Sequence, residues 1–339
     1  MYLWEFCKVK FVLPHNTNRC KVGLKYPYPQ KIIIAEKQKM VYVLYNSKAC
    51  NGNIQEKLNG LKRLYESKEK RIEFKSVLEI TDYKSFFDSI NEDDDVIIAG
   101  GDGTLNRFVN NIEGLEIKNP LYSYAAGTGN DFLKDVKDKD LNGIVQINKY
   151  IKDLPIVTVN GKEYRYLNNV GFGIDGYCCE VGDKLLLESD KPVNYTSVAI
   201  KGLLFHFHPA NAKITVDGVT KEYKKVWLAP TMNGRYYGGG MMITPDQDRL
   251  NEDRLVSCAV FYGTGKIRTL MIFPKIFTGG HVKYTKHLDF MQGHEIKVEF
   301  DRPTALQIDG ETFTNITEYT VRSGKGLKLK KDEKKLENV

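Results

Sequence analysis

The stretch DDDVIIAGGDGTLNRF, residues 93–108, runs from three acids through an apolar segment into a turn of two glycines, an aspartate, a third glycine and a threonine. The apolar segment 96–100 predicts a buried strand, and a helix is predicted after the turn. Glycines let the backbone approach phosphate oxygens closely, and the N–H groups that begin a helix contact anions. The turn is therefore a candidate phosphate site, at which Thr104 can cap the helix or donate to a phosphate.

Asp102 is the unexpected member of this turn, because a carboxylate repels phosphates. Ribose hydroxyls, a metal-bound water or a substrate hydroxyl would each explain it as a ligand group. The simpler explanation is a tight strand-to-helix turn in which Asp102 accepts hydrogen bonds from nearby backbone. Spacing alone leaves both explanations open.

A second turn of the same kind occurs at AAGTGNDF, residues 125–132, again with glycines, a hydroxyl and an acid at the end of a predicted strand. Two such turns on strands that could be neighbours are improbable as a coincidence. Neither turn matches G-x-x-x-x-G-K-[ST] or G-x-G-x-x-G, the common nucleotide patterns. The spacing therefore predicts a phosphate site of an unusual type.

Strand and helix candidates alternate up to about residue 155. Strands are predicted at 41–45, 74–81, 96–100 and 121–127, with helices from 54, at 83–90 and from 105. This alternation predicts a parallel sheet covered by helices on both faces. Ligands of such sheets bind beyond the carboxyl ends of the strands, which is where both glycine turns lie.

The second half of the chain has a different pattern. Asn160-Gly161 and Asp217-Gly218 predict two hairpins, and helices are predicted near 194–207 and 266–277. The predicted fold class is α/β plus all-β, with an N-terminal α/β nucleotide-binding domain on a parallel sheet and a C-terminal antiparallel β-sandwich domain. The predicted division is an N-terminal extension at 1–40, the α/β domain at 41–155, the sandwich at 156–315, and a C-terminal segment with a charged tail at 316–339.

Composition narrows the class of protein. Six cysteines without a C-x-x-C pair indicate reduced thiols, and no apolar run approaches the roughly 20 residues that span a bilayer, so a cytoplasmic protein is expected. A net charge of +7 suits nucleic acid, an anionic membrane or a phosphorylated substrate. No helix-turn-helix, RNA-binding signature or zinc finger occurs, so no nucleic-acid partner is expected.

GGDGTLN and AAGTGNDF together resemble the catalytic domain shared by diacylglycerol kinases, sphingosine kinases and the bacterial YegS/DgkB-type lipid kinases. Three later stretches resemble the family in the same order along the chain: NNVGFGID at 168–175, GGGMMITPDQDRLNEDRL at 238–255 and IDGE at 308–311. The resemblance covers about residues 41 to 325. It implies an ATP- and magnesium-dependent lipid kinase that phosphorylates a hydroxyl of diacylglycerol or a related lipid alcohol.

The resemblance also implies roles for individual residues. ATP would contact Asn46, Ser47, Thr81, Gly100, Gly101, Asp102, Gly103, Thr104, Gly127, Thr128, Asn130 and Asp131. Glu311 would be the catalytic base that takes the proton of the lipid hydroxyl, with Asp102 as the second catalytic residue. Catalytic Mg²⁺ would arrive with ATP and be held by Asp102 or, through water, by Asp131. A structural Mg²⁺ would be bound by the Leu250 carbonyl, the Asp253 side chain and the Leu255 carbonyl.

Three departures from the family pattern leave alternatives open. The first phosphate turn, YNSKACNGN, lacks the usual proline, Thr158 occupies the position of an aspartate, and Arg254 follows Asp253 where the family has glycine. One alternative is a soluble-substrate kinase similar to NAD kinases, which also use a GGDGT turn. The other is a nucleotide-binding regulator that has lost catalysis. Glu311→Gln separates these, because it should abolish turnover only in a kinase.

A lipid kinase needs an apolar region that reaches its substrate. The segments TSVAIKGLLFHFHP at 196–209 and IRTLMIFPKIF at 267–277 are apolar helix candidates, with Lys266, Arg268 and Lys275 beside the second. They predict peripheral contact with an anionic membrane, with the alternative that both helices simply cover the sandwich core. A homodimer is left open.

Overall fold

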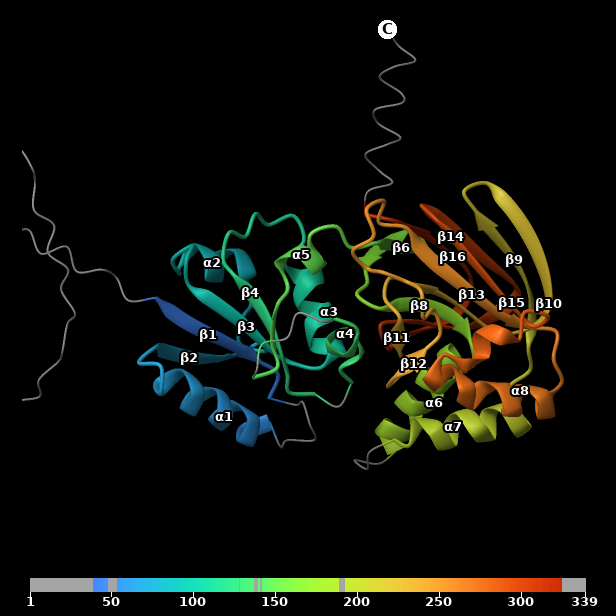
Figure 1. The fold of residues 1–339 in the computed structure, drawn as a ribbon, viewed down its shortest axis with the longest axis horizontal. Helices are drawn as coiled ribbons and strands as arrows, with labels where there is room; N and C mark the ends of the chain where they lie inside the picture. The colour runs from blue at the N-terminus through green and yellow to red at the C-terminus, as the bar shows by residue number, and fades with distance from the viewer. Residues whose placement is uncertain are drawn as a thin grey trace, which may run out of the picture.

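The computed structural model describes residues 39–47, 54–127, 129–136, 140, 142–188 and 193–324. These residues form two domains that lie side by side, the first from β1 to α5 and the second from β6 to β16 (Figure 1). The predicted fold class is confirmed. The predicted boundaries at 155 and 315 stay predictions, and the extension, apart from its last two residues, lies outside the described residues, as does the tail from 325.

The first domain is built on a five-stranded sheet in the order β2-β1-β3-β4-β5. Its strands are β1 (Met40–Tyr45), β2 (Arg71–Ser76), β3 (Asp95–Gly100), β4 (Leu121–Ala125) and β5 (Ile144–Gln146). The first four strands pair in parallel, as predicted. The short strand β5, which the sequence did not predict, pairs antiparallel with β4 at the edge.

Helices cover both faces of this sheet. They are α1 (Ile54–Glu66), α2 (Tyr83–Asp88), α3 (Asp102–Asn111), α4 (Asp131–Asp135) and α5 (Asn148–Ile151). Alternate residues of β1 show the two cores: Val43 packs in the cluster of Leu61 on the α1 side, and Leu44 packs with Phe108 on the α3 side. Figure 1 shows α1 on one side of the sheet and α2 and α3 on the other.

One predicted strand has the wrong boundaries. A strand was predicted at 74–81, whereas β2 spans Arg71–Ser76. The extended chain ends there because Asp82 caps α2, its side chain accepting the N–H of Lys84 at 2.9 Å. The apolar residues Val77 and Ile80, which suggested a longer strand, pack from the connecting loop against the core beneath α2.

The second domain is a nine-stranded, mostly antiparallel sheet that folds over on itself. Its strands are β6 (Ile156–Val159), β7 (Lys162–Arg165), β8 (Asn169–Gly173), β9 (Ala210–Val216), β10 (Val219–Met232), β13 (Val256–Tyr262), β14 (Leu288–Gly293), β15 (Glu295–Ile308) and β16 (Glu311–Arg322). Two of them, β10 and β15, are long and interrupted by bulges. Each pairs with β9 in its first half and with β8 in its second, which lets one sheet enclose a sandwich core.

Both predicted hairpins are confirmed. β6 and β7 meet at Asn160-Gly161, with φ of 48° and 75°, and β9 and β10 meet at Asp217-Gly218, with φ of 46° and 86°. Two positive φ values are what a type I′ turn requires, and asparagine or aspartate before glycine tolerates them best. Residues 316–322 complete β16, and a small ribbon of β11 (Tyr236–Tyr237) and β12 (Met241–Met242) stands apart from the main sheet.

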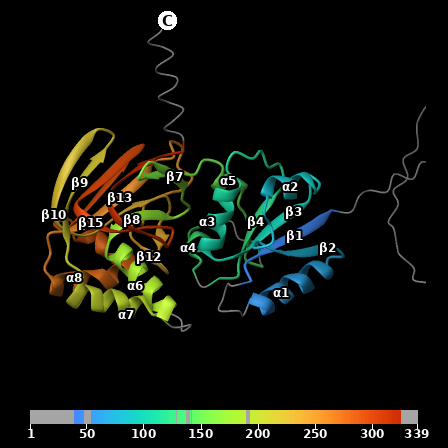
Figure 2. The same ribbon diagram turned by 180° about the vertical axis from the view of Figure 1, so that it is seen from behind.

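A helical layer covers one side of the sandwich, along one edge of the second domain in both Figure 1 and Figure 2. It consists of α6 (Ile174–Glu188), α7 (Tyr195–Lys201), the π-helix η2 (Gly202–His206), α8 (Lys266–Ile272) and the 3₁₀ helices η3 (Phe273–Thr278) and η4 (Gly280–Lys283). Its inner side chains pack in one core with Trp227 of the sheet. None of the described helices is long and apolar enough to cross a bilayer.

The helix α6 was not predicted. Ile174, Tyr177, Val181 and Leu185 do recur every three or four positions along it. A tertiary contact also fixes its place: Gly176 in its first turn lies so close to β15 that a Cβ would be 2.1 Å from the carbonyl oxygen of Ala305. Only glycine permits that approach of helix to strand.

Candidate functional site

The two glycine turns lie against each other at the carboxyl ends of β3 and β4. The Ala126 N–H donates to the Gly100 carbonyl, and the Asp102 N–H donates to the Gly129 carbonyl, both at 3.0 Å. A Cβ on Gly127 would lie 2.5 Å from the backbone nitrogen of Gly101. The contact between the turns is therefore backbone on backbone, and glycine is required at its centre.

The carboxylate of Asp102 binds the second turn. Its Oδ2 accepts the N–H of Asp131 at 2.7 Å, its Oδ1 accepts the N–H of Phe132 at 3.1 Å, and the Asn168 side chain is a further partner. Burial raises the pKa of Asp102, and these hydrogen bonds oppose that rise. Of the explanations left open for Asp102, the structure shows that its carboxylate accepts backbone hydrogen bonds. The donors belong to the second glycine turn and not to the turn that contains Asp102.

A third strand end joins this edge through Asn46, which follows β1. Its amide lies 3.5 Å from the hydroxyl of Thr104, whose side chain is buried at the start of α3. Lys57 of α1 donates to the carbonyl of Ala125 at 2.8 Å, so a cation that the sequence analysis did not single out also lies at the end of β4. Ser47 follows Asn46 and is exposed.

The remaining residues predicted to bind nucleotide are placed less uniformly. Gly103 is exposed with open space where a Cβ would be, and Thr81 is exposed in the loop between β2 and α2. Thr128 lies outside the described residues. Asn130 donates to the Gly127 carbonyl at 2.8 Å, while its buried Oδ1 has no hydrogen-bond partner among the described residues. A buried acceptor without a partner fits a ligand that brings a donor.

Asp131 reaches across to the second domain. Its Oδ2 accepts the N–H of Gly239 at 2.7 Å, and the Gly240 N–H is a further donor. These glycines belong to the run 238–240, whose positive φ values of 58°, 82° and 113° turn its N–H groups toward the acid. Burial, with a smaller contribution from the charge of Asp102, raises the pKa of Asp131 to about 6.

A buried ion cluster ties the domains together beside this contact. Asp135 lies at the end of α4 and forms ion pairs with two arginines of the second domain. Its Oδ1 is 2.6 Å from Nε of Arg235, and its Oδ2 is 2.7 Å from Nε of Arg249. Arg249 also donates to Oδ1 of Asn168 at 3.2 Å. Hydrogen bonds therefore connect Asp135 through Arg249 and Asn168 to Asp102. The sequence analysis missed every member of this chain except Asp102.

The IDGE segment lies on α3, and its two acids do different things. Asp309 is half-buried and accepts the N–H groups of 167–169 at 2.5 to 3.0 Å and the amide of Asn106 at 2.7 Å. Burial nevertheless raises the pKa of Asp309 to about 6. Glu311 is 47% exposed and forms an ion pair with Arg107 at 3.0 Å, beside a small cavity of about 140 Å³.

Among the described residues no hydrogen bond or ion pair joins Glu311 to the glycine turns. It lies instead next to α3, the helix that begins at Asp102. The sequence analysis quoted Asp309 without giving it a role. It is nevertheless the acid of IDGE that interacts electrostatically with the first glycine turn, because the charge of Asp102 contributes to the raised pKa of Asp309.

The loop predicted to bind a structural magnesium makes hydrogen bonds of its own in this structure. The Leu255 carbonyl accepts the amides of Gln247 at 2.9 Å and Asn251 at 3.0 Å, which occupies both of its lone pairs. Asp253 is exposed, and Arg254 next to it has a φ of 56°. Among the described residues no three His, Cys, Asp or Glu side chains gather as a metal site. Leu250, Asp253 and Leu255 as ligands stay a prediction.

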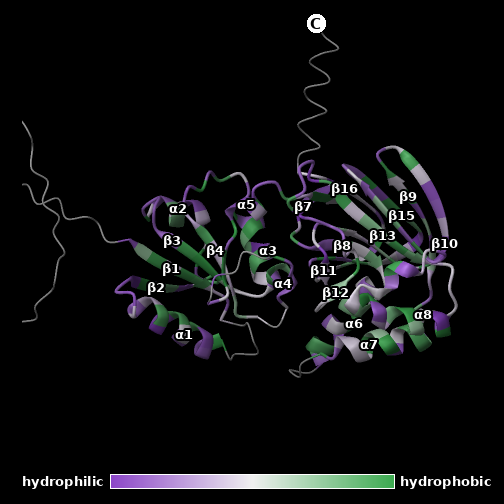
Figure 3. Cartoon of the chain, in the orientation of Figure 1, coloured by the Kyte–Doolittle hydropathy of each residue, from purple (hydrophilic) through white to green (hydrophobic). Residues whose placement is uncertain are grey.

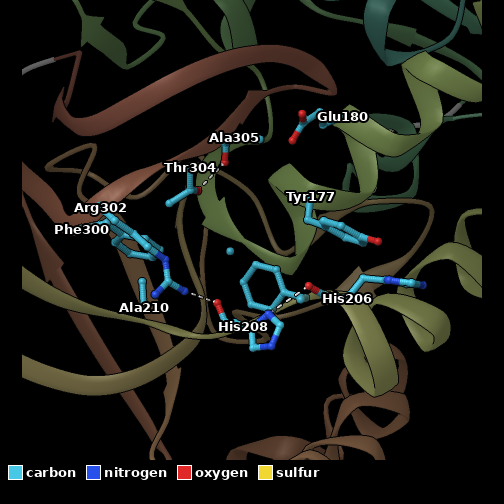
Figure 4. A pocket seen from close by; sticks show the side chains of 11 residues that line it. Tyr177, Glu180, His206, His208, Ala210, Phe300, Arg302, Thr304 and Ala305 are labelled. Carbon is cyan, nitrogen blue, oxygen red and sulfur yellow. Dashed lines mark hydrogen bonds between the residues drawn. The ribbon is translucent and has the colours of Figure 1, made fainter.

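A cavity of about 430 Å³ lies elsewhere in the second domain, between α6, the segment after η2 and the bulged part of β15 (Figure 4). Its walls combine the aromatic side chains Tyr177, Phe207 and Phe300 with His206 and Arg302. Figure 4 shows the Arg302 guanidinium directed at the carbonyl of His208, to which it donates. None of the residues predicted to bind nucleotide or metal or to act in catalysis lines this cavity, whereas His206, Phe207 and His208 belong to the apolar segment predicted at 196–209.

Comparison with known families divides the chain where the structure does. A model described as the diacylglycerol kinase catalytic domain matches residues 40–157, and one described as the YegS C-terminal NAD kinase beta sandwich-like domain matches residues 168–324. The chain belongs to the diacylglycerol kinase family. Within that family it has the DgkB/YegS-like arrangement, in which the two matched domains follow each other, and the predicted resemblance is confirmed.

Individual relatives are distant. A diacylglycerol kinase of Mycobacterium tuberculosis (strain ATCC 25618 / H37Rv) is 25% identical over 197 residues, covering 56% of this chain and 62% of that protein. A diacylglycerol kinase of Bacillus subtilis (strain 168) is 24% identical, covering 66% and 73%. The match to the first of these spans less than two thirds of its length.

Solved structures share the fold of the whole described chain. One from Bacillus anthracis str. Sterne superposes with a TM-score of 0.60 at 20% identity, covering 88% of this chain and 95% of its own. Another, of a diacylglycerol kinase from the same organism, reaches 0.54 at 19% identity, covering 85% and 96%. At these identities the likeness shows the fold alone.

Proposed function

We propose that this protein transfers the γ-phosphoryl group of ATP to a hydroxyl of diacylglycerol or a related lipid alcohol. The observation that carries the proposal is the backbone contact between the turns at 100–104 and 127–131, in a domain that matches the catalytic domain of the family. Phosphoryl transfer needs positioned donors and charge neutralisation more than covalent chemistry from the protein. The N–H groups of Asp131 and Phe132 are taken by Asp102, so a triphosphate would bind the remaining N–H groups of the glycine turns, such as that of the exposed Gly103 at the start of α3.

The residues at this edge suit a nucleotide in several ways. The unpartnered Oδ1 of Asn130 can accept a donor of the ligand, and Asn46 with Thr104 offers polar groups at the end of β1. Mg²⁺ bound with the nucleotide would neutralise phosphate charge. Asp102 and Asp131 each keep acceptor lone pairs beyond the backbone hydrogen bonds described above, so they remain the side chains that would hold it.

Glu311 is the proposed base. The acceptor hydroxyl would give its proton to a carboxylate oxygen of Glu311 as its own oxygen bonds to the γ-phosphorus and ADP leaves. For this, Glu311 must exchange Arg107 for the hydroxyl. Both side chains are exposed, 47% and 67%, and exposed ion pairs contribute little stability, so the exchange is easy.

The test is incubation of radiolabelled ATP with a panel of lipid alcohols in mixed micelles, with separation of the products. We expect label on a diacylglycerol and loss of turnover, with ATP binding retained, in Glu311→Gln. Glu318→Gln is the matched control, because Glu318 is an exposed acid on the same strand whose cation partner is Lys297. Label on NAD alone would favour the soluble-substrate alternative, and equal turnover in both variants would remove Glu311 from the mechanism.

The acceptor of such an enzyme lies in a membrane. We therefore also propose a cytoplasmic protein in peripheral contact with an anionic bilayer. The net charge of +7 supports this, and the surface responsible can be located in the structure.

A further inference from the structure

Large apolar side chains are exposed mainly on the helical layer of the second domain. Those on it are Leu185, Leu186, Leu187, Tyr195, Ile200, Phe205, Ile267, Met271, Phe277 and Val282. Elsewhere among the described residues only Leu78, Val219 and Phe290 are comparably exposed. Soluble proteins seldom leave such a patch open without a binding partner for it. Figure 3 shows apolar colour along α6, α7 and α8 at one edge of the domain.

The helix α8 shows that this exposure is not incidental. Thr269 and Ile272 are buried against the sandwich, while Ile267 and Met271, four positions apart, are 78% and 67% exposed. Residues four apart lie on one face of a helix, here the face opposite the buried one. A helix that only covered a core would place polar side chains there. Phe205 of the neighbouring η2 is exposed to a similar degree, 66%.

Charge on these helices is of one sign. The segments 194–209 and 266–287 contain no aspartate or glutamate, although the whole chain has 43 acids and 50 lysines and arginines. The cations within them are Lys201, Lys266, Arg268, Lys275, Lys283 and Lys286. Acids of α6, such as Asp183 and Glu188, lie outside both segments, so the basic character belongs to the helices from α7 onward.

We propose that the outer surface of α7, η2, α8, η3 and η4, here called the docking face, binds the surface of an anionic lipid bilayer. Its apolar side chains would enter the boundary between headgroups and acyl chains, and its cations would lie at the level of the lipid phosphates. A lipid surface suits this face because exposed aliphatic and aromatic side chains are combined there with cations, and neither segment contains an acid.

The position of the docking face agrees with the proposed chemistry. In both Figure 1 and Figure 2 the end of α6 and the start of α7 lie beneath the boundary between the two domains. A bilayer on the docking face would therefore be close to that boundary, across which Asp131 of the second glycine turn contacts Gly239. Docking itself needs neither nucleotide nor turnover, so it can be tested independently of the proposed function.

The first test is co-sedimentation of the full chain with vesicles, without ATP. We expect binding to phosphatidylcholine vesicles that contain phosphatidylglycerol, and about tenfold weaker binding for the double variant Ile267→Glu and Met271→Glu. Val219→Glu is the matched control, since Val219 is 68% exposed on the β9–β10 hairpin, away from α8. It should bind as the unaltered protein does. Equal loss in variant and control would overturn the proposal.

The second test concerns charge. Arg268→Gln should weaken binding about fivefold at low salt, and this difference should vanish at about 0.5 M salt. Lys213→Gln, which removes a cation of the β9–β10 hairpin that pairs with Glu222, should have no effect. Equal binding to neutral and anionic vesicles would contradict the proposal. So would a dimer in solution that the Ile267→Glu and Met271→Glu changes dissociate, because the face would then be a contact between copies.

Activity separates the docking face from the catalytic site. The docking variants should phosphorylate a short-chain, dispersed diacylglycerol as the unaltered protein does and lose activity only on vesicles. If vesicle binding behaves as expected but no lipid is phosphorylated, the proposed function fails while the docking face stands. If dispersed substrate is phosphorylated normally but vesicle binding is absent, the docking face fails alone.

Discussion

At the interface between the domains, Asp135 is 4% exposed and is held by two arginines, one of which is 4% exposed as well. On the docking face, Arg268 is exposed and stands among cations without an acid in its segment. Both regions concentrate charge. At the interface the charges neutralise each other inside the molecule, whereas on the docking face the positive charge is exposed and can attract a negatively charged surface. A buried, paired cluster fixes one arrangement of the domains, whereas an exposed field of one sign attracts a surface of the other.

Loss of an ion-pair partner should therefore destabilise the protein far more at this interface than at an exposed ion pair. Asp135→Asn would leave Arg235 and Arg249 without their anion in a site where water cannot replace it. We expect a loss of about 3–5 kcal/mol in the free energy of unfolding, measured with urea. The loss should be accompanied by easier proteolysis between the domains.

Asp88→Asn provides the control for this change. Asp88 pairs with Lys84 at 2.6 Å on the surface of α2, where both side chains are about two thirds exposed. Its replacement should leave the urea midpoint unchanged, because exposed pairs are screened and mobile. A similar shift in the two variants would mean that burial at the interface adds nothing to the pair.

Asp175 tests the opposite case, a buried acid without a cation. It lies in the first turn of α6, where its carboxylate accepts a 3.4 Å hydrogen bond from Gln307 and backbone N–H groups of the turn, while its Oδ1 has no partner among the described residues. Burial raises its pKa from 3.8 to about 7. The folded state thus binds a proton more tightly than the unfolded state, and its stability falls as pH rises through that interval.

Asp175→Asn removes this titration while keeping the shape of the side chain. We expect the variant to be more stable than the unaltered protein at pH 8, by about 4 kcal/mol. The two should converge near pH 3, where Asp175 is mostly protonated in both states. Urea unfolding from pH 3 to pH 8 measures the difference. A constant offset over that range would show that Asp175 does not titrate on unfolding.

The sequence predicted what is local. Short apolar runs predicted strands of the first sheet, and Asn160-Gly161 and Asp217-Gly218 predicted two hairpins of the second domain. The two glycine turns also carry their own signal, because each needs glycine for a close backbone approach. These features depend on residues within a few positions of each other, so a single sequence is enough to find them.

What the sequence did not predict depends on contacts between distant positions. Asp135 and Arg249 are 114 residues apart, and Asn106 and Asp309 are 203 apart. Nothing in the spacing of DFLKD or PDQDRL indicates that the two segments meet. The helix α6 differs, because the helical spacing from Ile174 to Leu185 was available and overlooked, while only its close packing on β15 depends on distant residues. Most of the interface, including the partners of Asp102, was therefore beyond reach.

The smallest expected effect concerns the chain of hydrogen bonds from the ion cluster to Asp102. Arg249 contacts Asp135, the Leu167 carbonyl and Asn168, whereas Arg235 contacts only Asp135 within this cluster. Lysine at either position keeps the charge but loses the fork of donors. Only Arg249→Lys releases Asn168, which is itself a partner of Asp102.

If Asn168 orients Asp102 during phosphoryl transfer, Arg249→Lys should lower kcat about tenfold in the mixed-micelle assay, roughly 1.4 kcal/mol in the barrier. KM for ATP should change little, because the glycine turns are untouched. Arg235→Lys should change kcat by no more than about twofold. An equal fall in kcat in both variants would mean that the arginines act by holding the domains together, because both of them pair with Asp135. A rise in KM with constant kcat would mean that Arg249 serves nucleotide binding instead.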